Sequence, residues 1–345
     1  MDIYDILRQV WFVLVGVLLA GYSVLDGFDL GIGALFPFLA KKDEDKDVLV
    51  KAIGPFWDGN EVWLLTGGGA LFAAFPQAYA TVFSGFYLAL MVVLFSLIFR
   101  AVSLEFRTHD PKRKRFWEGA FVVGSFLPAL LYGVALGNVI QGVPLNANMD
   151  FTGNFFTLLR PFPLAVGLLG LAAFLLHGAV FAALKSEGEL QDRARKTAGW
   201  LWHRYIALFI LAFTLTLVYL PGAVGKWPAW VFTAVMIVSL VLLKSALGKK
   251  KDGRAFFFSA LSFLGLWGIA GAVHFPCLVR ASNGEAFSLT ITNASSSELT
   301  LKVMLIIALI GMPLVIFYTV YAYKVFRGKV GAGEEVYEGG ERRRK

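Results

Sequence analysis

The sequence predicts an all-α membrane protein, a polytopic transmembrane helical bundle of about nine membrane-spanning helices, with the N-terminus outside and the C-terminus inside. Three observations predict this class. Hydrophobic residues make up 57% of the 345 residues and charged residues only 16%, whereas a typical soluble domain has roughly 25% charged residues. Apolar runs of about 20 residues or more, long enough to cross a bilayer, separate the charged stretches. Lysine and arginine are abundant in alternate connecting segments only.

The predicted spans follow one another through short connections. We expect them at residues 8–39, 54–76, 79–104, 117–140, 161–184, 199–220, 229–247, 255–277 and 302–327. The first is long enough to be tilted or kinked. The second is the least typical, because it contains Asp58, Asn60, Glu61 and three successive glycines. We expect residues 1–327 to form a single transmembrane domain and residues 328–345 a polar cytoplasmic tail.

The cations of the connecting segments predict the orientation. Four segments are strongly basic, as is the tail, and the segments between them carry few cations; the basic ones are 40–53, 100–117, 185–199 and 244–254. Cytoplasmic loops are enriched in lysine and arginine, so the basic segments are expected inside. The same pattern favours nine spans over eight, since without the span at 54–76 the basic segment 100–117 would lie outside.

Composition also excludes several classes of function. A formal charge of +8 would suggest nucleic acid binding in a soluble protein, but here it is explained by cytoplasmic loops, and no nucleic acid partner is expected. The single cysteine, Cys277, rules out an intrachain disulfide, a cysteine haem-attachment motif and a cysteine zinc site. We expect neither a metal site nor a catalytic residue in this chain.

The first predicted span contains two aspartates, Asp26 and Asp29, among glycines. They are three residues apart, so they share one face of a helix. A carboxylate in the bilayer interior costs about 2.5–3.5 kcal/mol on insertion scales, and such residues are functional candidates that face protein or water. Glycines at this point allow a neighbouring helix to approach closely. The alternative is an aspartate pair at an interface that binds an arginine of a partner.

The second predicted span opens with Asp58 and Glu61 on a shared face, with Asn60 nearby, between Trp57 and Trp63. Two acidic pairs in one small membrane protein suggest a path for protons or cations. The alternative is an ordinary helix N-terminus near the membrane surface, where the helix dipole favours acids and tryptophans are common.

Arg100 and Glu105 lie at the end of the third predicted span. Without further information they are interpreted as an arginine whose charged end reaches the lipid phosphates and as an exposed glutamate. His177 and His274 lie inside apolar runs, where two histidines could ligate haem. No accompanying motif supports haem ligation, so we interpret both as structural.

Seven short segments, in order along the chain, resemble subunit II of cytochrome bd-type quinol oxidases. Any one of them is weak evidence, but the ordered set covers nearly the whole chain. They are residues 26–29 (DGFD), 57–60 (WDGN), 69–76 (GALFAAFP), 83–87 (FSGFY), 141–144 (QGVP), 152–156 (TGNFF) and 296–301 (SSELTL).

The resemblance implies a heterodimer with a haem-bearing subunit I, in which haem b and haem d, or haem b alone, oxidise quinol and reduce dioxygen to water. The complex would lie in a bacterial or archaeal cytoplasmic membrane, among membrane lipid. A small accessory subunit and a bound quinone, with Trp57 and Trp63 as candidate contacts, are further expectations from the resemblance.

The same resemblance implies a task for subunit II, which is to support subunit I and to contribute to proton delivery from the cytoplasm. By their places in the motifs, Asp26, Asp29 and Asp58 resemble intramembrane members of the proton path, and Arg100 and Glu105 its cytoplasmic mouth. The competing hypothesis is a proton- or cation-coupled secondary transporter, in which the same carboxylates bind the cation and glycine-rich breaks form discontinuous helices. No internal repeat supports it.

Overall fold

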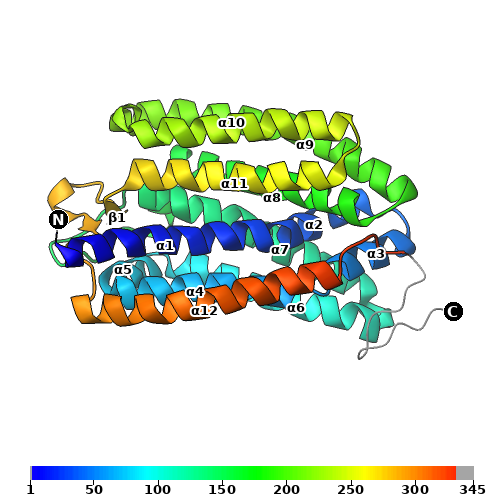
Figure 1. Ribbon diagram of the computed structural model, residues 1–345, viewed down its shortest axis with the longest axis horizontal. Helices are drawn as coiled ribbons and strands as arrows, with labels where there is room; N and C mark the ends of the chain where they lie inside the picture. The colour runs from blue at the N-terminus through cyan, green and yellow to red at the C-terminus, as the bar shows by residue number, and fades with distance from the viewer. Residues whose placement is uncertain (1, 332–345) are drawn as a thin grey trace.

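A computed structural model of the chain describes residues 2–331. Most of the predicted tail, from residue 332 onward, lies outside the described residues. The described part is an elongated bundle whose long helices run along one common axis (Figure 1). Pairs of successive helices pack antiparallel, among them α7 (Lys114–Gln141) on α8 (Pro161–Lys185) and α10 (Trp227–Gly248) on α11 (Asp252–His274). The predicted all-α bundle is confirmed.

The first predicted span is two helices. α1 (Ile3–Leu25) ends one residue before Asp26, and α2 (Gly27–Leu39) begins one residue after it. The short amphipathic helix α3 (Asp43–Ile53) follows at the basic end of the bundle (Figure 1). The second predicted span, 54–76, is α4 (Trp57–Ala74). The third, 79–104, is divided between α5 (Pro76–Gly85), which Pro76 starts at its first turn, and α6 (Tyr87–His109).

Two of the long helices extend well beyond their predicted bounds. α6 (Tyr87–His109) runs five residues past the predicted boundary at 104, and α9 (Gly188–Tyr219) begins eleven residues before residue 199. Both extra segments are polar, so hydropathy alone ended the prediction too early. α12 (Glu298–Val325) is the last helix.

Eight helical segments of the described chain are long and apolar enough to cross a membrane, counting α1 and α2 together. α4 is not among them, although it runs beside α1 and connects the basic end, where α2 finishes, to the opposite end, where α6 starts (Figure 1). α1 begins at one end of the bundle and α12 finishes at the other (Figure 1). The ninth span and the orientation stay predictions.

The basic segments meet at one end of the bundle. The connections α2–α4, α6–α7, α8–α9 and α10–α11 all lie at the right of Figure 1. At the opposite end, β1 (Cys277–Val279) and β2 (Leu289–Thr290) form a small antiparallel sheet, and 3-10 turns begin at Phe155 and Glu285. This segregation is what the alternation of cations predicts for a protein with one cytoplasmic face.

α2 is the centre of the bundle. Phe28, Leu30 and Ile32 have no exposed surface, and the helix packs between α7 and α8. Gly31 lies directly against Gly178 of α8, since a Cβ on Gly31 would be 2.0 Å from the carbonyl oxygen of Phe174. The prediction that glycines near Asp29 admit a neighbouring helix is therefore confirmed, and Asp26 and Asp29 are held at fixed depth.

Candidate functional site

The site is built on the interruption between α1 and α2. A helix end leaves carbonyl groups without partners, and inside a membrane these must be satisfied by protein. The amide nitrogen of Asn60 on α4 donates to the carbonyl of Leu25 at 2.8 Å. The Nε2 atom of His177 on α8 lies 3.0 Å from the carbonyl of Val24. Side chains of α4 and α8 thus provide hydrogen-bond partners for two carbonyl groups at the break.

His177 has no exposed surface, and both of its ring nitrogens are engaged. A carbonyl can only accept, so Nε2 carries the proton that it donates to Val24. Nδ1 lies 2.7 Å from the hydroxyl of Ser259 on α11, and the ring stacks on Phe256 at 4.7 Å between centroids. Both ring nitrogens therefore have partners within the protein, and the structural interpretation of His177 stays a prediction.

A charged cluster lies at the break. Arg100, on α6, bonds Asp26 through both oxygens, from Nη1 at 2.8 Å and from Nη2 at 2.5 Å. The same guanidinium contacts Glu61 from Nη1 at 3.2 Å and Asp29 from Nη2 at 4.0 Å. Arg100, Asp26 and Asp29 have fully buried side chains, and that of Glu61 is 22% exposed. One buried cation therefore faces three acids.

Asp29 differs from Asp26 in how it is held. Its Oδ2 atom accepts a hydrogen bond from the amide of Asn60 at 2.7 Å. Its Oδ1 atom is buried and has no hydrogen-bond partner among residues 2–331. Asn60 is held in turn by Tyr323 of α12, whose hydroxyl donates to the side-chain Oδ1 atom of Asn60 at 3.3 Å. This free oxygen can take up a proton without the loss of a hydrogen bond.

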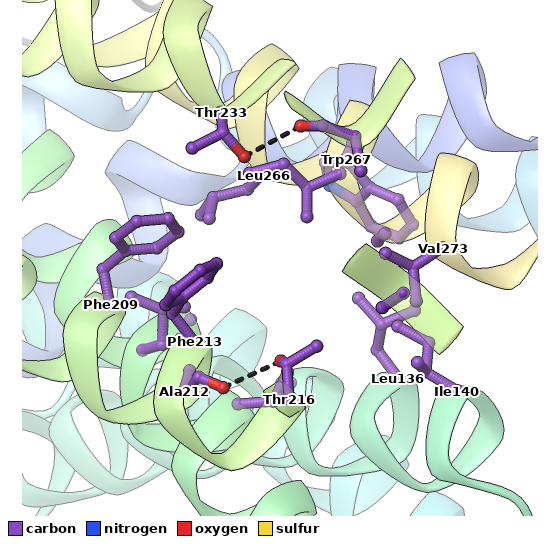
Figure 2. A pocket seen from close by; sticks show the side chains of 18 of the residues that line it. Leu136, Ile140, Phe209, Ala212, Phe213, Thr216, Thr233, Leu266, Trp267 and Val273 are labelled. Atoms are coloured by element: carbon purple, nitrogen blue, oxygen red, sulfur yellow. Dashed lines mark hydrogen bonds between the residues drawn. The ribbon is translucent and has the colours of Figure 1, made fainter. Parts of the chain in front are cut away.

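A tyrosine pair continues the polar groups outward from Asp26. Tyr22 precedes Asp26 by one helical turn, and its hydroxyl donates to that of Tyr132 on α7 at 3.2 Å. Tyr132 also lines a partly open apolar cavity of about 180 Å³, to which α7, α8, α9, α10 and α11 contribute most of the wall. Figure 2 shows Phe209, Phe213, Leu266 and Val273 around this space.

The basic end of the bundle carries a second set of ion pairs. Arg107, only 4% exposed, contacts Asp47 of α3 at 2.7 Å and Glu118 of α7 at 3.3 Å. Lys46 bonds the same glutamate at 2.9 Å. Hydrogen bonds from Lys46 and Lys114 lower the pKa of Asp43, which lies fully exposed on α3. These pairs tie α3 across the ends of α6 and α7, beneath the buried cluster.

The structure brings together three of the residues singled out in the sequence, Asp26, Asp29 and Arg100. It corrects the interpretation of Arg100, which is not at a surface mouth but is fully buried. Asp58 is exposed and lies outside the cluster, and Glu105 is exposed near the end of α6. The sequence predicts Asp58 inside the membrane span at 54–76, but its side chain is exposed in this chain alone.

The tryptophans also lie elsewhere than expected. Trp57 packs on the central apolar core, and the indole of Trp63 covers Gly21 of α1, where a Cβ would be 2.5 Å from the ring. Neither lines the apolar cavity of Figure 2. A quinone contact at Trp57 and Trp63 stays a prediction.

The sequence predicted no role for Asn60, Tyr22 and Tyr323, and it indicated Glu61 only as the partner of Asp58 in an acidic pair. Tyr22 could have been found from its spacing, because it lies four residues before Asp26 on the same helical face. Glu61 and Asn60 stood in the quoted acidic motif, but a single sequence does not show which of its residues point inward. Tyr323 carried no local signal, since only the packing of α12 brings it to Asn60.

Comparisons with known proteins identify the family of the chain. The sequence model of the family described as cytochrome bd terminal oxidase subunit II matches residues 7–326. The chain is 38% identical to the probable cytochrome oxidase subunit 2 of Haemophilus influenzae, over 95% of this chain and 96% of that protein. It is 36% identical to the cytochrome bd-I ubiquinol oxidase subunit 2 of Escherichia coli K12, with the same coverage.

A third relative, the cytochrome bd ubiquinol oxidase subunit 2 of Bacillus subtilis, is 36% identical over 95% of this chain and 98% of its own length. Among solved structures, the fold resembles a chain of the bd oxidase from Geobacillus thermodenitrificans, with a TM-score of 0.78. That similarity covers 93% of this chain and 98% of the other at 18% sequence identity, so it bears on the fold alone. All the relatives named are bacterial.

Proposed function

The chain belongs to the cytochrome bd terminal oxidase subunit II family, and from this premise we propose that its buried carboxylates carry protons toward the oxygen-reducing site of its partner. The protein is an integral membrane subunit of a haem-containing quinol oxidase, an oxidoreductase that includes a subunit I. Membership removes the transporter hypothesis. The bacterial relatives favour the bacterial cytoplasmic membrane, and nothing supports the archaeal alternative.

The observation that carries the proposal is the excess of acids around Arg100. If all four groups were ionised, the charge would be +1 from Arg100 and −3 from Asp26, Asp29 and Glu61, a sum of −2. Uncompensated buried charge costs several kcal/mol per ion. The cluster therefore holds at least one proton at neutral pH. Because Asp26 is bonded through both oxygens to Arg100, the proton is shared by Asp29 and Glu61.

Asp29 is the resident proton carrier in this proposal. A proton bound at its free Oδ1 atom needs no rearrangement of the Asn60 bond at Oδ2. Asn60 positions Asp29 but cannot relay a proton itself, since an amide does not titrate in the working range. Glu105, exposed beyond Arg100 toward the basic end of α6, is the proposed point of entry from the cytoplasm.

Subunit I is proposed to cover the exposed face of α4. Asp58, Leu65 and Phe72 lie on this face, all exposed in the single chain. A carboxylate on a lipid-facing helix is costly, so Asp58 requires a protein or water-filled neighbour. The apolar window of α12, beside α4, has no buried residues. Docking of subunit I here would bring Asp58 into a continuous path with the cluster.

We propose that the haems, haem b with haem d or haem b alone, are bound by subunit I. In this chain His177 is committed to Val24 and Ser259, so its surroundings do not fit haem. No step of the reaction is assigned to a haem of this subunit. The reduction of dioxygen is a property of the whole complex. The same holds for the choice between ubiquinol and menaquinol and for any small accessory subunit.

A quinone bound to this subunit is proposed to use the cavity of Figure 2 rather than Trp57 and Trp63. The cavity wall is almost wholly apolar and aromatic, which suits an isoprenoid chain. The hydroxyl of Tyr132 accepts from Tyr22 and keeps its own proton for a carbonyl oxygen.

Replacement of Asp29 by asparagine tests the proton path. The variant preserves shape and removes the ionisable group, so quinol-driven oxygen consumption of the purified complex should fall at least about tenfold. Haem content and subunit ratio, measured on the same preparation, should change little. Full turnover in an assembled Asp29→Asn complex would contradict the proposal.

A further inference from the structure

Glu61 is the one acid that belongs both to the buried cluster and to the surface of the chain. Its Oε1 atom is buried and contacts Arg100 Nη1, while its side chain is 22% exposed. The other three members of the cluster have no exposed surface. Asp58 lies three residues earlier on α4, on the same face, and is exposed. Glu61 therefore stands at the boundary between the cluster and the face left for subunit I.

Of the two acids that contact Nη1 of Arg100, Glu61 is the more weakly held. Asp26 bonds this nitrogen at 2.8 Å and the second terminal nitrogen at 2.5 Å. Glu61 contacts Nη1 alone, at 3.2 Å, without the geometry of a hydrogen bond. Charge-assisted bonds of the bidentate kind are the strong ones. Asp26 thus anchors Arg100, and Glu61 can leave it at little cost.

We propose that Glu61 is the carboxyl group through which protons leave the buried cluster for the face of α4 that subunit I covers. The inference rests on the proposed proton path and names its exit. Asp29 and Glu61 contact the two terminal nitrogens of one guanidinium. Transfer of a proton breaks an O–H bond on Asp29 and forms one on Glu61, so the charge of the cluster does not change.

Protonation releases Glu61 from Arg100, because a neutral carboxyl group no longer forms an ion pair. The longer glutamate side chain can then turn toward Asp58 on the exposed face of α4. After Glu61 passes its proton outward, the carboxylate is again attracted to Arg100. A glutamine at this position would keep the shape and polar contacts but could not carry a proton.

The test compares three variants of the complete oxidase, Glu61→Gln, Glu61→Asp and the matched control Glu44→Gln. Glu44 is exposed on α3, away from the cluster. We expect Glu61→Gln to assemble with normal haem content and melting temperature but to slow quinol-driven oxygen consumption by about tenfold at mildly alkaline pH. The deficit should shrink as the pH is lowered, because other groups then receive protons more readily. Glu61→Asp should recover most of the turnover, and Glu44→Gln should match the unmodified protein.

Two results would overturn the inference. One is a normal turnover and pH profile in assembled Glu61→Gln. The other is loss of assembly, haem or thermal stability in Glu61→Gln, which would show that Glu61 is only a structural partner of Arg100. Asp29→Asn, measured in parallel, distinguishes an error about the exit at Glu61 from an error about the proton path as a whole. If Asp29→Asn is slow and Glu61→Gln is normal, only the exit is wrong, whereas normal turnover in Asp29→Asn removes the proton path itself.

Discussion

Replacing Asp26 by asparagine should destabilise the protein far more than the same change at Asp29. Asp26 provides both of the close bonds to Arg100, at 2.8 and 2.5 Å. Removing one partner of a buried ion pair costs about 3–5 kcal/mol. Glu61 at 3.2 Å and Asp29 at 4.0 Å remain to compensate Arg100. We therefore expect a loss at the lower end, about 3 kcal/mol.

The assay is thermal unfolding of the purified complex, followed by haem absorbance at a fixed scan rate, because membrane complexes often unfold irreversibly. A loss of about 3 kcal/mol corresponds to a fall in melting temperature of about 6–12 °C if this chain behaves as a large domain. Asp29→Asn is the matched control. This variant makes the same chemical change one helical turn from Asp26, and it loses only the 4.0 Å contact with Arg100. Its melting temperature should therefore fall by about 4 °C at most.

Two further variants test whether the loss of stability in Asp26→Asn comes from the unpaired charge of Arg100. Arg100→Met alone leaves three acids without their cation, which then take up protons. In the double variant Asp26→Asn with Arg100→Met, both charges of the pair are absent, so the loss should be smaller than the sum of the two single losses. Equal melting temperatures for Asp26→Asn and Asp29→Asn, or strictly additive losses in the double variant, would refute Asp26 as the anchor of Arg100.

Three further predictions follow from the same geometry. Asp58→Asn should slow quinol-driven oxygen consumption by about tenfold without lowering the melting temperature, since Asp58 is exposed and makes no ion pair within the described chain; a stable variant with full turnover would exclude Asp58 from the path. His177→Ala and His274→Ala should leave the haem spectrum of assembled complexes intact, and a missing haem band would show that one of them is a ligand. Cys277, the single cysteine, lies in β1 at the end opposite the basic segments, so a membrane-impermeant maleimide should label it in intact cells. Burial raises the pKa of its thiol, so labelling should be slow at neutral pH and accelerate as the pH rises, whereas no labelling from outside would refute the orientation.

The sequence was sufficient for the bundle and for part of the site, for physical reasons that can be stated. Hydropathy predicts helices because the backbone polar groups of a long apolar segment must find hydrogen-bond partners within the protein inside a membrane, and a helix supplies them within the segment itself. It misplaced Arg100, because an arginine near the end of an apolar run ordinarily reaches the lipid phosphates. Here α6 continues to His109, and Arg107 closes its end through Asp47 and Glu118. Arg100 is therefore more than two turns inside the helix, where its partners are Asp26 at the break between α1 and α2, Asp29 of α2 and Glu61 of α4.

The error at Asp58 has a different origin, and it bears on how the two subunits work together. Successive residues of a helix are about 100° apart, so Asp58 and Asn60 are about 200° apart and face opposite sides. Asn60 is buried against Asp29, and Asp58 is exposed. Glu61 is about 60° from Asp58 by the same geometry, and it contacts Arg100 from the edge. α4 thus carries polar groups for its own bundle and for an outer neighbour at once. No single hydrophobic face describes such a helix, which explains both why its sequence is the least typical of the predicted spans and why we expect it to be the shared wall between the two subunits.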